Sequence, residues 1–460
     1  MYKLDFNNKE TNVYFCGIGG ISMSGLAEVL LDRGLKVTGS DRASSDLTDA
    51  LSANGAKIFI GQKADNVTSD IDLFVYTAAI HPDHPEFVKA TELNIPMLTR
   101  AELLGQIMKN YDFPVAVSGT HGKTTVTSML SEILMEADKD PTLSVGGILE
   151  SIGGNIRIGH SDIFVTEACE YTNSFLSFFP KASIILNVEA DHLDFFKDID
   201  DIRNSFHKFA SLTPEDGVVI IGNDIPGKDV VLKDIKSKII TFGRDEKADY
   251  YPLNIHYDDM GYGHFEVVSP LGREDMDLKI PGEHNVMNAL AAIAMADYMG
   301  IDRSFTKKAL RNFGGAKRRF EYKGNVNGVT IIDDYAHHPS EIRATLNAAK
   351  NYPHKKLYVA FQPHTYTRTK ALLDDFADAL SIADMVVLAK IYPARETDNL
   401  GISSEDVAVR IRNKGTESVY LPEFDMIEKF VKESCSPGDL FITMGAGDVV
   451  NIANDLTGSK

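Results

Sequence analysis

The sequence predicts an α/β protein with parallel sheets. Two observations predict this fold class. Apolar, β-branched runs alternate with helical patterns along the chain, and three of these runs meet a glycine-bearing turn that is followed by a helix. The three strand, turn and helix units cover residues 12–30, 115–134 and 440–452. Each unit is typical of the repeating element of a parallel sheet that is covered by helices.

The length indicates more than one domain. The chain has 460 residues, of which 43% are hydrophobic, and single cores stop growing beyond roughly 250–300 residues. We expect one boundary near residues 109–112, where a polar patch precedes Pro114, and another near residues 314–318. The expected domains are 1–110, 111–316 and 317–460.

The composition excludes several classes of protein. A formal net charge of −19 repels a nucleic-acid backbone, so we expect no nucleic-acid partner. The sequence has neither a signal-peptide pattern nor a stretch of about 18 apolar residues, so we expect no membrane partner. Three widely spaced cysteines form neither a disulfide framework nor a CxxC pair. These features predict a cytoplasmic protein, and both a monomer and a homodimer fit them.

A phosphate-binding loop is predicted between a strand at residues 114–117 and a helix at residues 124–135. It reads Gly119-Thr120-His121-Gly122-Lys123-Thr124-Thr125. Backbone N–H groups of the turn and of the helix N-terminus would point at the phosphates of ATP. Lys123 would neutralise the transferring phosphoryl group, and Thr124 would bind Mg²⁺, with Mn²⁺ as an alternative ion. Val117 stands where the usual GxxxxGK[ST] pattern has its first glycine, and a plain glycine turn with a solvated lysine is the alternative.

A second glycine loop follows the first predicted strand. Gly17, Gly19 and Gly20 precede Ser22 and a helix, and Asp41 ends the next strand-like run. The pattern is similar to the dinucleotide fingerprint GxGxxG, but Ser22 stands in place of its last glycine. We interpret the loop as a diphosphate site, either for NAD or for the pyrophosphate of a sugar nucleotide. A turn with a purely structural function is the alternative.

Acidic and imidazole side chains follow two further strand-like runs, at residues 163–165 and 183–188. Glu167 follows the first run and His192 the second. Because the carboxyl ends of parallel strands meet at one edge of a sheet, Glu167 and His192 are candidates, with Thr124, for a Mg²⁺ site beside the triphosphate. For each residue alone, helix capping or surface charge is the alternative.

Four segments together resemble the Mur ligase family over nearly the whole chain. They are residues 17–24, residues 119–125, the run GEHNVMN at 282–288 and the run DDYAHHP at 333–339. The resemblance implies a Rossmann-like N-terminal domain for a UDP-sugar, a central P-loop ATPase domain, and a Rossmann-like C-terminal domain for an amino acid. It therefore favours the sugar-nucleotide interpretation of the first glycine loop.

The resemblance also implies ATP-binding residues beyond the loop. Asn285 and Asn288 lie at i and i+3 of a predicted helix and would read adenine, and capping of that helix is the alternative. Arg319 would lie near the ATP phosphates, where a basic domain linker is the alternative. Asp334 would reach the edge of the ATP site from a strand at residues 329–332.

Candidates for the amino-acid site lie in the last third of the chain. Arg368 and His364 resemble the carboxylate clamp of the family, although many relatives carry arginine where this chain has Thr365. In the family, His337 and its neighbour Tyr335 line the reaction cleft. A merely helix-capping role of His364 and Arg368 is the alternative.

Two adjacent histidines, His337 and His338, raise the question of zinc. Neighbouring side chains at the start of a helix diverge, and neither a cysteine nor a third histidine stands at ligand spacing. We therefore do not expect zinc on this pair.

The resemblance is strongest to family members of peptidoglycan synthesis that join L-alanine to UDP-N-acetylmuramate. ATP would phosphorylate the lactyl carboxylate of the sugar nucleotide, and the amine of L-alanine would attack the acyl phosphate. The expected catalytic residues are Lys123, Glu167, His192, His337 and Arg368. Three alternatives remain: a recycling ligase that adds a whole peptide, a nicotinamide dehydrogenase built on the first glycine loop, and a non-catalytic ATP-binding module.

Overall fold

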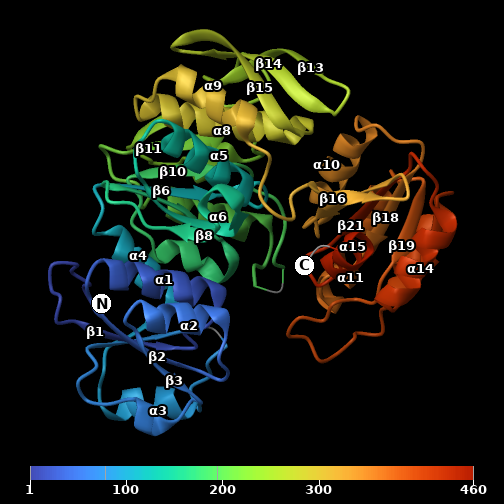
Figure 1. Ribbon diagram of the computed structural model, residues 1–460. Coiled ribbons are helices and arrows are strands. Elements are labelled where there is room, and N and C mark those ends of the chain that lie inside the picture. Colours follow the sequence, from blue (N-terminus) through green and yellow to red (C-terminus); the bar gives the residue numbers. More distant parts are fainter. Residues whose placement is uncertain (1, 78, 194, 459–460) are drawn as a thin grey trace.

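The computed structural model describes residues 2–77, 79–193 and 195–458, and these form three α/β bodies (Figure 1). The N-terminal body, drawn in blue, lies below the green central body, and the orange and red C-terminal body stands beside both. Each body is built on one large sheet, so the predicted fold class is confirmed. Among the described residues, no helix combines the length and the apolar composition that crossing a membrane requires.

The N-terminal sheet has five parallel strands in the order β3-β2-β1-β4-β5. This order places the first strand in the middle, as in the Rossmann fold, and the turn after it lies at a point where the strand order reverses. The elements of this body are β1 Asn12–Cys16, α1 Ile21–Asp32, β2 Lys36–Asp41, α2 Asp46–Ala53, β3 Lys57–Ile60, β4 Leu73–Tyr76, α3 Pro85–Glu92, β5 Met97–Thr99 and α4 Arg100–Met108.

The central sheet has seven strands in the order β12-β11-β10-β6-β9-β7-β8, and β8 alone among them runs antiparallel to its neighbour. The elements are β6 Phe113–Ser118, α5 Lys123–Glu136, β7 Thr142–Leu149, β8 Gly154–Arg157, β9 Ile163–Glu167, β10 Ala182–Ile185, α6 Ile199–Ala210, β11 Val218–Gly222, α7 Lys228–Val231 and β12 Lys238–Phe242.

A three-stranded antiparallel sheet and two helices complete the central body. The sheet comprises β13 Tyr251–Tyr257, β14 Tyr262–Ser269 and β15 Gly272–Pro281, and the helices are α8 Glu283–Tyr298 and α9 Arg303–Asn312. Helix α8 is alanine-rich and buried along most of its length, because it packs against α5 and against both sheets. This packing fixes the start of α8 beside the loop that precedes α5.

The C-terminal sheet has six strands in the order β16-β17-β21-β18-β19-β20, with β16 antiparallel to β17. Its apolar residues form two clusters of their own, one on each face. The elements are β16 Glu321–Val326, β17 Val329–Asp334, α10 Pro339–Lys350, β18 Leu357–Phe361, α11 Tyr366–Ala371, α12 Leu373–Leu380, β19 Met385–Leu388, α13 Ser404–Asn413, β20 Glu417–Tyr420, α14 Phe424–Ser434, β21 Leu440–Met444 and α15 Val450–Thr457.

Two predicted elements differ from the observed ones. The strand expected at residues 183–188 ends at Ile185, because the chain turns away after its last pair with β6. The helix that His364 and Arg368 would cap in the alternative interpretation is divided at Leu372, whose φ of −114° and ψ of 25° are not helical.

Candidate functional site

The predicted phosphate loop connects β6 to α5, as the sequence indicated. Gly119 has a φ of +145° and Gly122 a φ of +85°, both in a region that favours glycine. A Cβ atom on Gly122 would lie 2.7 Å from Asn288 Oδ1, and one on Gly119 would lie 2.9 Å from Leu186 Cβ. Both glycines are therefore required by the backbone conformation and by the close approach of neighbouring segments.

Lys123 points back across the loop and pairs with a buried carboxylate. Its Nζ atom lies 3.0 Å from Glu170 Oε2 and donates to the carbonyl oxygen of Thr120 at 3.1 Å. Burial disfavours the lysine charge, but the Glu170 carboxylate outweighs burial and raises the pKa of Lys123. Glu170 is only 3% exposed, and sequence reasoning did not single it out. The available signal was a second acidic residue three positions after Glu167.

The three predicted metal ligands lie around this pair. Thr124 Oγ1 donates to Glu167 Oε2 at 3.2 Å, so these two candidates touch. His192 Nε2 lies 3.9 Å from Oε1 of Glu170, the carboxylate that also pairs with Lys123. Burial raises the pKa of Glu167. A hydroxyl, carboxylates and one imidazole lie at the end of the phosphate loop. This set consists mostly of oxygen donors, and its chemistry therefore fits Mg²⁺.

His192 does not come directly from a strand end, which corrects the prediction. It lies seven residues beyond Ile185, in a loop where its own φ is +53°. Its ring packs on Tyr171 with centroids 4.5 Å apart, and this contact holds the imidazole in place.

Beside the loop lies a cavity of about 380 Å³ between the central and C-terminal bodies. Its lining includes the predicted ATP-binding residues His121, Gly122, Thr125, Asn285, Asn288, Arg319 and Asp334. Asn285 Nδ2 donates to the carbonyl oxygen of Pro281 at 2.7 Å, and Asn288 Nδ2 donates to Asn285 Oδ1 at 3.1 Å. Neither side chain caps α8, whose N-cap is Gly282, so the capping alternative is wrong.

Burial strongly shifts the pKa values of two titratable groups in the lining of this cavity, Asp334 and His284. Burial raises the pKa of Asp334 to about 6, although its carboxylate accepts hydrogen bonds from the N–H groups of Phe320 and Ala336, both at 2.8 Å. Burial, assisted by Arg319, lowers the pKa of His284 to about 4. The guanidinium of Arg319 stacks over the ring of Tyr335 at 5.1 Å. The cavity therefore holds a neutral imidazole and a cation on one wall.

The predicted amino-acid clamp reaches from the C-terminal body to the loop that carries His192. Arg368 Nη2 lies 3.1 Å from Asp191 Oδ1, and its Nη1 lies 3.5 Å from His364 Nδ1. Burial opposes ionisation of Asp191, but Arg368 and His192 hold the pKa of its carboxyl group below the ordinary value. His364 packs against His337 with ring centroids 6.1 Å apart. The clamp residues thus come together, and Asp191 is a partner that sequence reasoning did not assign.

The turn before Arg368 is strained. Thr365 has a φ of +66°, a conformation that is rare for a β-branched residue. Tyr335 lies on the other side of His337, with ring centroids 5.4 Å apart. His337 itself precedes α10 instead of beginning it, because the helix starts at Pro339 with His338 as its N-cap.

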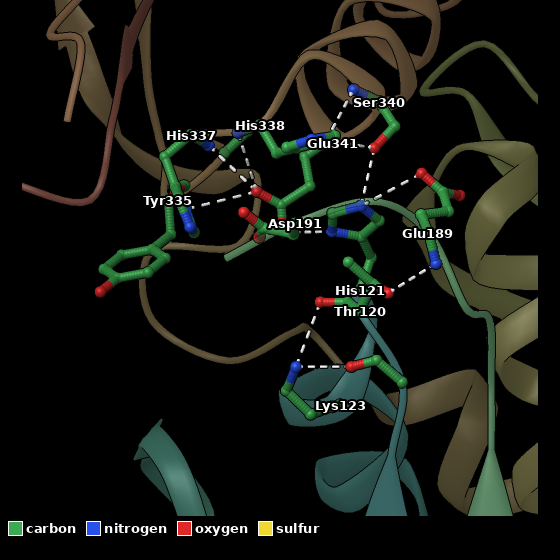
Figure 2. Close-up of polar contacts among 12 residues, drawn as sticks. Thr120, His121, Lys123, Glu189, Asp191, Tyr335, His337, His338, Ser340 and Glu341 are labelled. Carbon is green, nitrogen blue, oxygen red and sulfur yellow. Dashed lines mark hydrogen bonds and ion pairs between the residues drawn. The ribbon is translucent and has the colours of Figure 1, made fainter. Parts of the chain in front are cut away.

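A polar cluster joins the phosphate loop to the start of α10 (Figure 2). His121 Nε2 lies 2.7 Å from Ser340 Oγ and 3.4 Å from Glu189 Oε2, and its Nδ1 lies 3.1 Å from Glu341 Oε1. Although burial opposes a charge on the ring, Glu341 and Glu189 raise the pKa of His121 to about 9. Sequence reasoning gave His121 only a place in the loop and missed this interface, whose members lie far apart in the chain.

The first glycine loop forms a separate candidate site in the N-terminal body. The N–H groups of Gly17 and Ile18 both donate to the carbonyl oxygen of Ser40 at 2.9 Å, and the Gly19 N–H donates to Asp41 Oδ2 at 2.8 Å. Gly20 is the N-cap of α1, and Ser22 is an exposed residue of its first turn. The predicted residues are thus brought together at the end of β1, where a Rossmann-like sheet binds its ligand.

Three family models match consecutive parts of the chain. The model described as Mur ligase family, catalytic domain, matches residues 12–112, the Mur ligase middle domain matches residues 117–296, and the model described as Mur ligase, glutamate ligase domain, matches residues 318–447.

Similar proteins carry consistent names. The UDP-N-acetylmuramate--L-alanine ligase of Agathobacter rectalis is 59% identical, over 99% of both chains, and that of Lachnospira eligens is 57% identical, over 99% of this chain and 100% of its own. Among solved structures, a UDP-N-acetylmuramate-alanine ligase from Thermotoga maritima is 31% identical with a TM-score of 0.79, and covers 97% of this chain and 98% of its own. A murein peptide ligase from Psychrobacter arcticus is 25% identical with a TM-score of 0.69, and covers 98% of both chains.

Proposed function

This chain belongs to the Mur ligase family, and we propose that it joins L-alanine to the lactyl carboxylate of UDP-N-acetylmuramate at the expense of ATP. The names of its most similar relatives support this substrate pair. The observation that carries the proposal is the meeting of a phosphate loop and a carboxylate-binding arginine at one place. Lys123 and Arg368 come from different bodies, and both have contacts with the loop that carries Asp191 and His192. Lys123 pairs with Glu170, which faces His192, and Arg368 pairs with Asp191.

The three domains take the roles that this reaction requires. We propose boundaries at 1–110 for the UDP-sugar domain, 111–316 for the ATP domain and 317–460 for the amino-acid domain, which the three family matches support. Gly17, Gly19, Gly20 and Ser22 would hold the diphosphate of the sugar nucleotide, and Asp41 would accept a hydrogen bond from one of its sugar hydroxyl groups. The reaction belongs to the cytoplasmic stage of peptidoglycan synthesis, and neither a nucleic acid nor a membrane is a partner in it. Monomer and homodimer both remain compatible with the proposed site.

ATP would lie in the cavity beside α5, with its phosphates on the loop. Asn285 and Asn288 present amide groups that can read the adenine edge, and Arg319 and Asp334 line the same cavity. The backbone N–H groups of residues 119–125 and the N-terminus of α5 attract the phosphates. Lys123 would leave Glu170 for the γ-phosphate and offset the charge that develops during transfer.

Thr124, Glu167 and His192 would hold Mg²⁺, and Mn²⁺ has the same requirements. The bound ion supplies electrostatic stabilisation of the phosphoryl group during transfer. The protein groups around it fix the lactyl carboxylate and the phosphate in line, which accounts for most of the rate gain in such reactions.

The amino acid would bind between Arg368 and the loop of Asp191. Arg368 would take the carboxylate of L-alanine, with His364, His337 and Tyr335 around it. His337 is partly buried, and burial lowers its pKa to about 4, so its ring is neutral. Transfer of the γ-phosphoryl group from ATP to the lactyl carboxylate would give an acyl phosphate and ADP. The alanine amine would then attack the acyl carbon and lose a proton, and phosphate would leave from the tetrahedral intermediate. Because Thr365 replaces an arginine, one guanidinium carries the clamp.

Release of phosphate from ATP tests this proposal directly. The purified chain is incubated with ATP, Mg²⁺, UDP-N-acetylmuramate and, separately, L-alanine, L-serine, glycine or a tripeptide. We expect release that depends on both the sugar nucleotide and L-alanine. Release with the tripeptide and not with L-alanine would identify a recycling ligase, and ATP binding without any release would identify a non-catalytic module. An absorbance change with NADH would instead support the dehydrogenase.

A further inference from the structure

Three side chains at the junction of the central and C-terminal bodies can reach one common point. His121 belongs to the phosphate loop, Glu189 to the loop after β10, and His338 to the N-cap of α10. One ligand atom of each lies within 4.8 Å of one ligand atom of each of the others. The rings of His121 and His338 have centroids 5.1 Å apart, and His121 Nε2 lies 3.4 Å from Glu189 Oε2. Two imidazoles and a carboxylate therefore converge from two domains.

The Nδ1 atom of each imidazole faces a polar neighbour. His121 Nδ1 lies 3.1 Å from Glu341 Oε1, and His338 Nδ1 lies 2.8 Å from Ser340 Oγ. Histidines that bind metal ions usually donate their second ring N–H to a carboxylate or another acceptor, which fixes the ring and its tautomer. Glu341 and Ser340 thus supply the support that such ligands need at the two Nδ1 atoms. His121 Nε2, which lies 2.7 Å from Ser340 Oγ, would exchange this contact for the ion.

His338 Nε2 provides a second and independent observation. The residue is 7% exposed, yet this nitrogen has no hydrogen-bond partner among the residues that the structure describes. A buried polar atom without a partner costs free energy, and such atoms in proteins commonly mark an unseen water or ion. A cation bound between the two rings would satisfy it.

We propose that His121, Glu189 and His338 bind one divalent ion of the zinc class, separate from the magnesium site. Two imidazoles with one carboxylate form a common ligand set of Zn²⁺ with a fourth position open, whereas Mg²⁺ prefers oxygen ligands and retains water. The two positive charges of the ion offset the carboxylates of Glu189 and Glu341, which lie 3.4 and 3.1 Å from His121. This set differs from the adjacent pair His337 and His338, because the second imidazole comes from the phosphate loop.

Binding of the ion would fasten the C-terminal domain to the phosphate loop. His121 and Glu189 come from the central domain and His338 from the C-terminal domain, so all three ligands are available only while the two domains touch. The ion therefore holds the domains together and adds to the stability of the closed arrangement in proportion to its binding. It requires no nucleotide, sugar or amino acid.

Zn²⁺ titration of the full-length chain tests this site. Binding is measured calorimetrically in excess Mg²⁺, which occupies the oxygen-rich site, and Co²⁺ replaces Zn²⁺ for a visible spectrum of tetrahedral coordination. We expect one Zn²⁺ per chain, a rise in melting temperature with Zn²⁺, and a Co²⁺ spectrum that Zn²⁺ abolishes. His338→Gln and Glu189→Gln should each weaken binding by at least about tenfold. The two variants change different domains, so one remains informative if the other fails to fold.

His264→Gln is the matched control. His264 stacks on His256 and lies 2.8 Å from Asp277, so it belongs to another histidine and carboxylate cluster, on β14. We expect this variant to bind Zn²⁺ as the unchanged chain does. Equal affinity in the His338→Gln and Glu189→Gln variants, or a loss in His264→Gln, would overturn the assignment. Because no turnover is measured, the outcome is independent of the proposed ligase reaction.

Discussion

Lys123 of the phosphate loop forms an ion pair with the buried carboxylate of Glu170, with Nζ 3.0 Å from Oε2. The same carboxylate faces His192 at 3.9 Å through its other oxygen. A lysine held this way keeps its charge in a dry environment and is available when a phosphate arrives. Glu170 therefore sets the position of the cation that the loop presents to ATP.

Replacing Lys123 by alanine should lower turnover by on the order of 10²-fold or more, because the charge that offsets the transferring phosphoryl group is lost. The measurement is the steady-state rate of phosphate release with saturating substrates. Lys139→Ala, in the turn after the same helix, is the control and should leave the rate unchanged. A Lys123→Ala variant with near-normal turnover would disprove the role of this loop.

Replacing Glu170 by glutamine tests whether this carboxylate keeps Lys123 protonated. The amide keeps the shape of the side chain but leaves Lys123 without its buried counter-charge, so we expect the pKa of the lysine to fall. Turnover of the variant should then decline at a lower alkaline pH than turnover of the unchanged chain. The rate of phosphate release is followed from neutral to alkaline pH in both proteins. Identical pH profiles would show that Glu170 does not control the lysine charge.

Sequence patterns identified those parts of the site that lie within one continuous motif. The turn at Gly119 and Gly122, the loop at Gly17 and the amides on α8 were all predicted, because glycine conformations and helix periodicity are local properties. The strand, turn and helix units were also predicted from local sequence patterns. Local signals therefore predicted the fold class and the turns and helix that surround the cavity beside α5.

Contacts between distant segments could not be predicted in this way. Glu189, His338 and Glu341 meet His121 only because the C-terminal domain packs on the loops of the central sheet. Asp191 became a partner of Arg368 for the same reason. The sequence analysis considered His338 only beside His337, and it gave no role to Glu341, because only tertiary packing brings these residues to their partners.

Replacing Arg368 by lysine should weaken binding of the amino acid more than it slows the chemistry. Lysine keeps the charge but cannot make two parallel hydrogen bonds to a carboxylate, so we expect the KM for L-alanine to rise by about tenfold, with a smaller effect on the KM for ATP. Arg410→Lys, on α13, is the control and should change neither value. Equal changes in both KM values would argue against a carboxylate clamp.

The partly buried imidazole of His284 should make folding stability depend on pH. Burial and the nearby Arg319 lower its pKa from 6.5 to about 4, whereas Glu341 acts in the opposite direction. Between these two values the unfolded chain binds a proton that the folded chain does not, so stability should fall as pH drops from 6.5 towards 4. The contribution of this one group is at most about 3 kcal/mol. Above pH 6.5 both states hold a neutral ring and the effect vanishes.

Urea unfolding of the unchanged chain and of His284→Gln, measured at several pH values between 4 and 6.5, isolates this contribution. Other buried histidines affect both proteins alike, so the difference between the two curves belongs to His284. We expect the variant to lose less stability on acidification than the unchanged chain, while His81→Gln, which changes an exposed histidine, follows the unchanged chain. Parallel curves for the unchanged chain and His284→Gln would mean that this imidazole is accessible to protons, and that the wall of the ATP cavity is open to water in the folded protein.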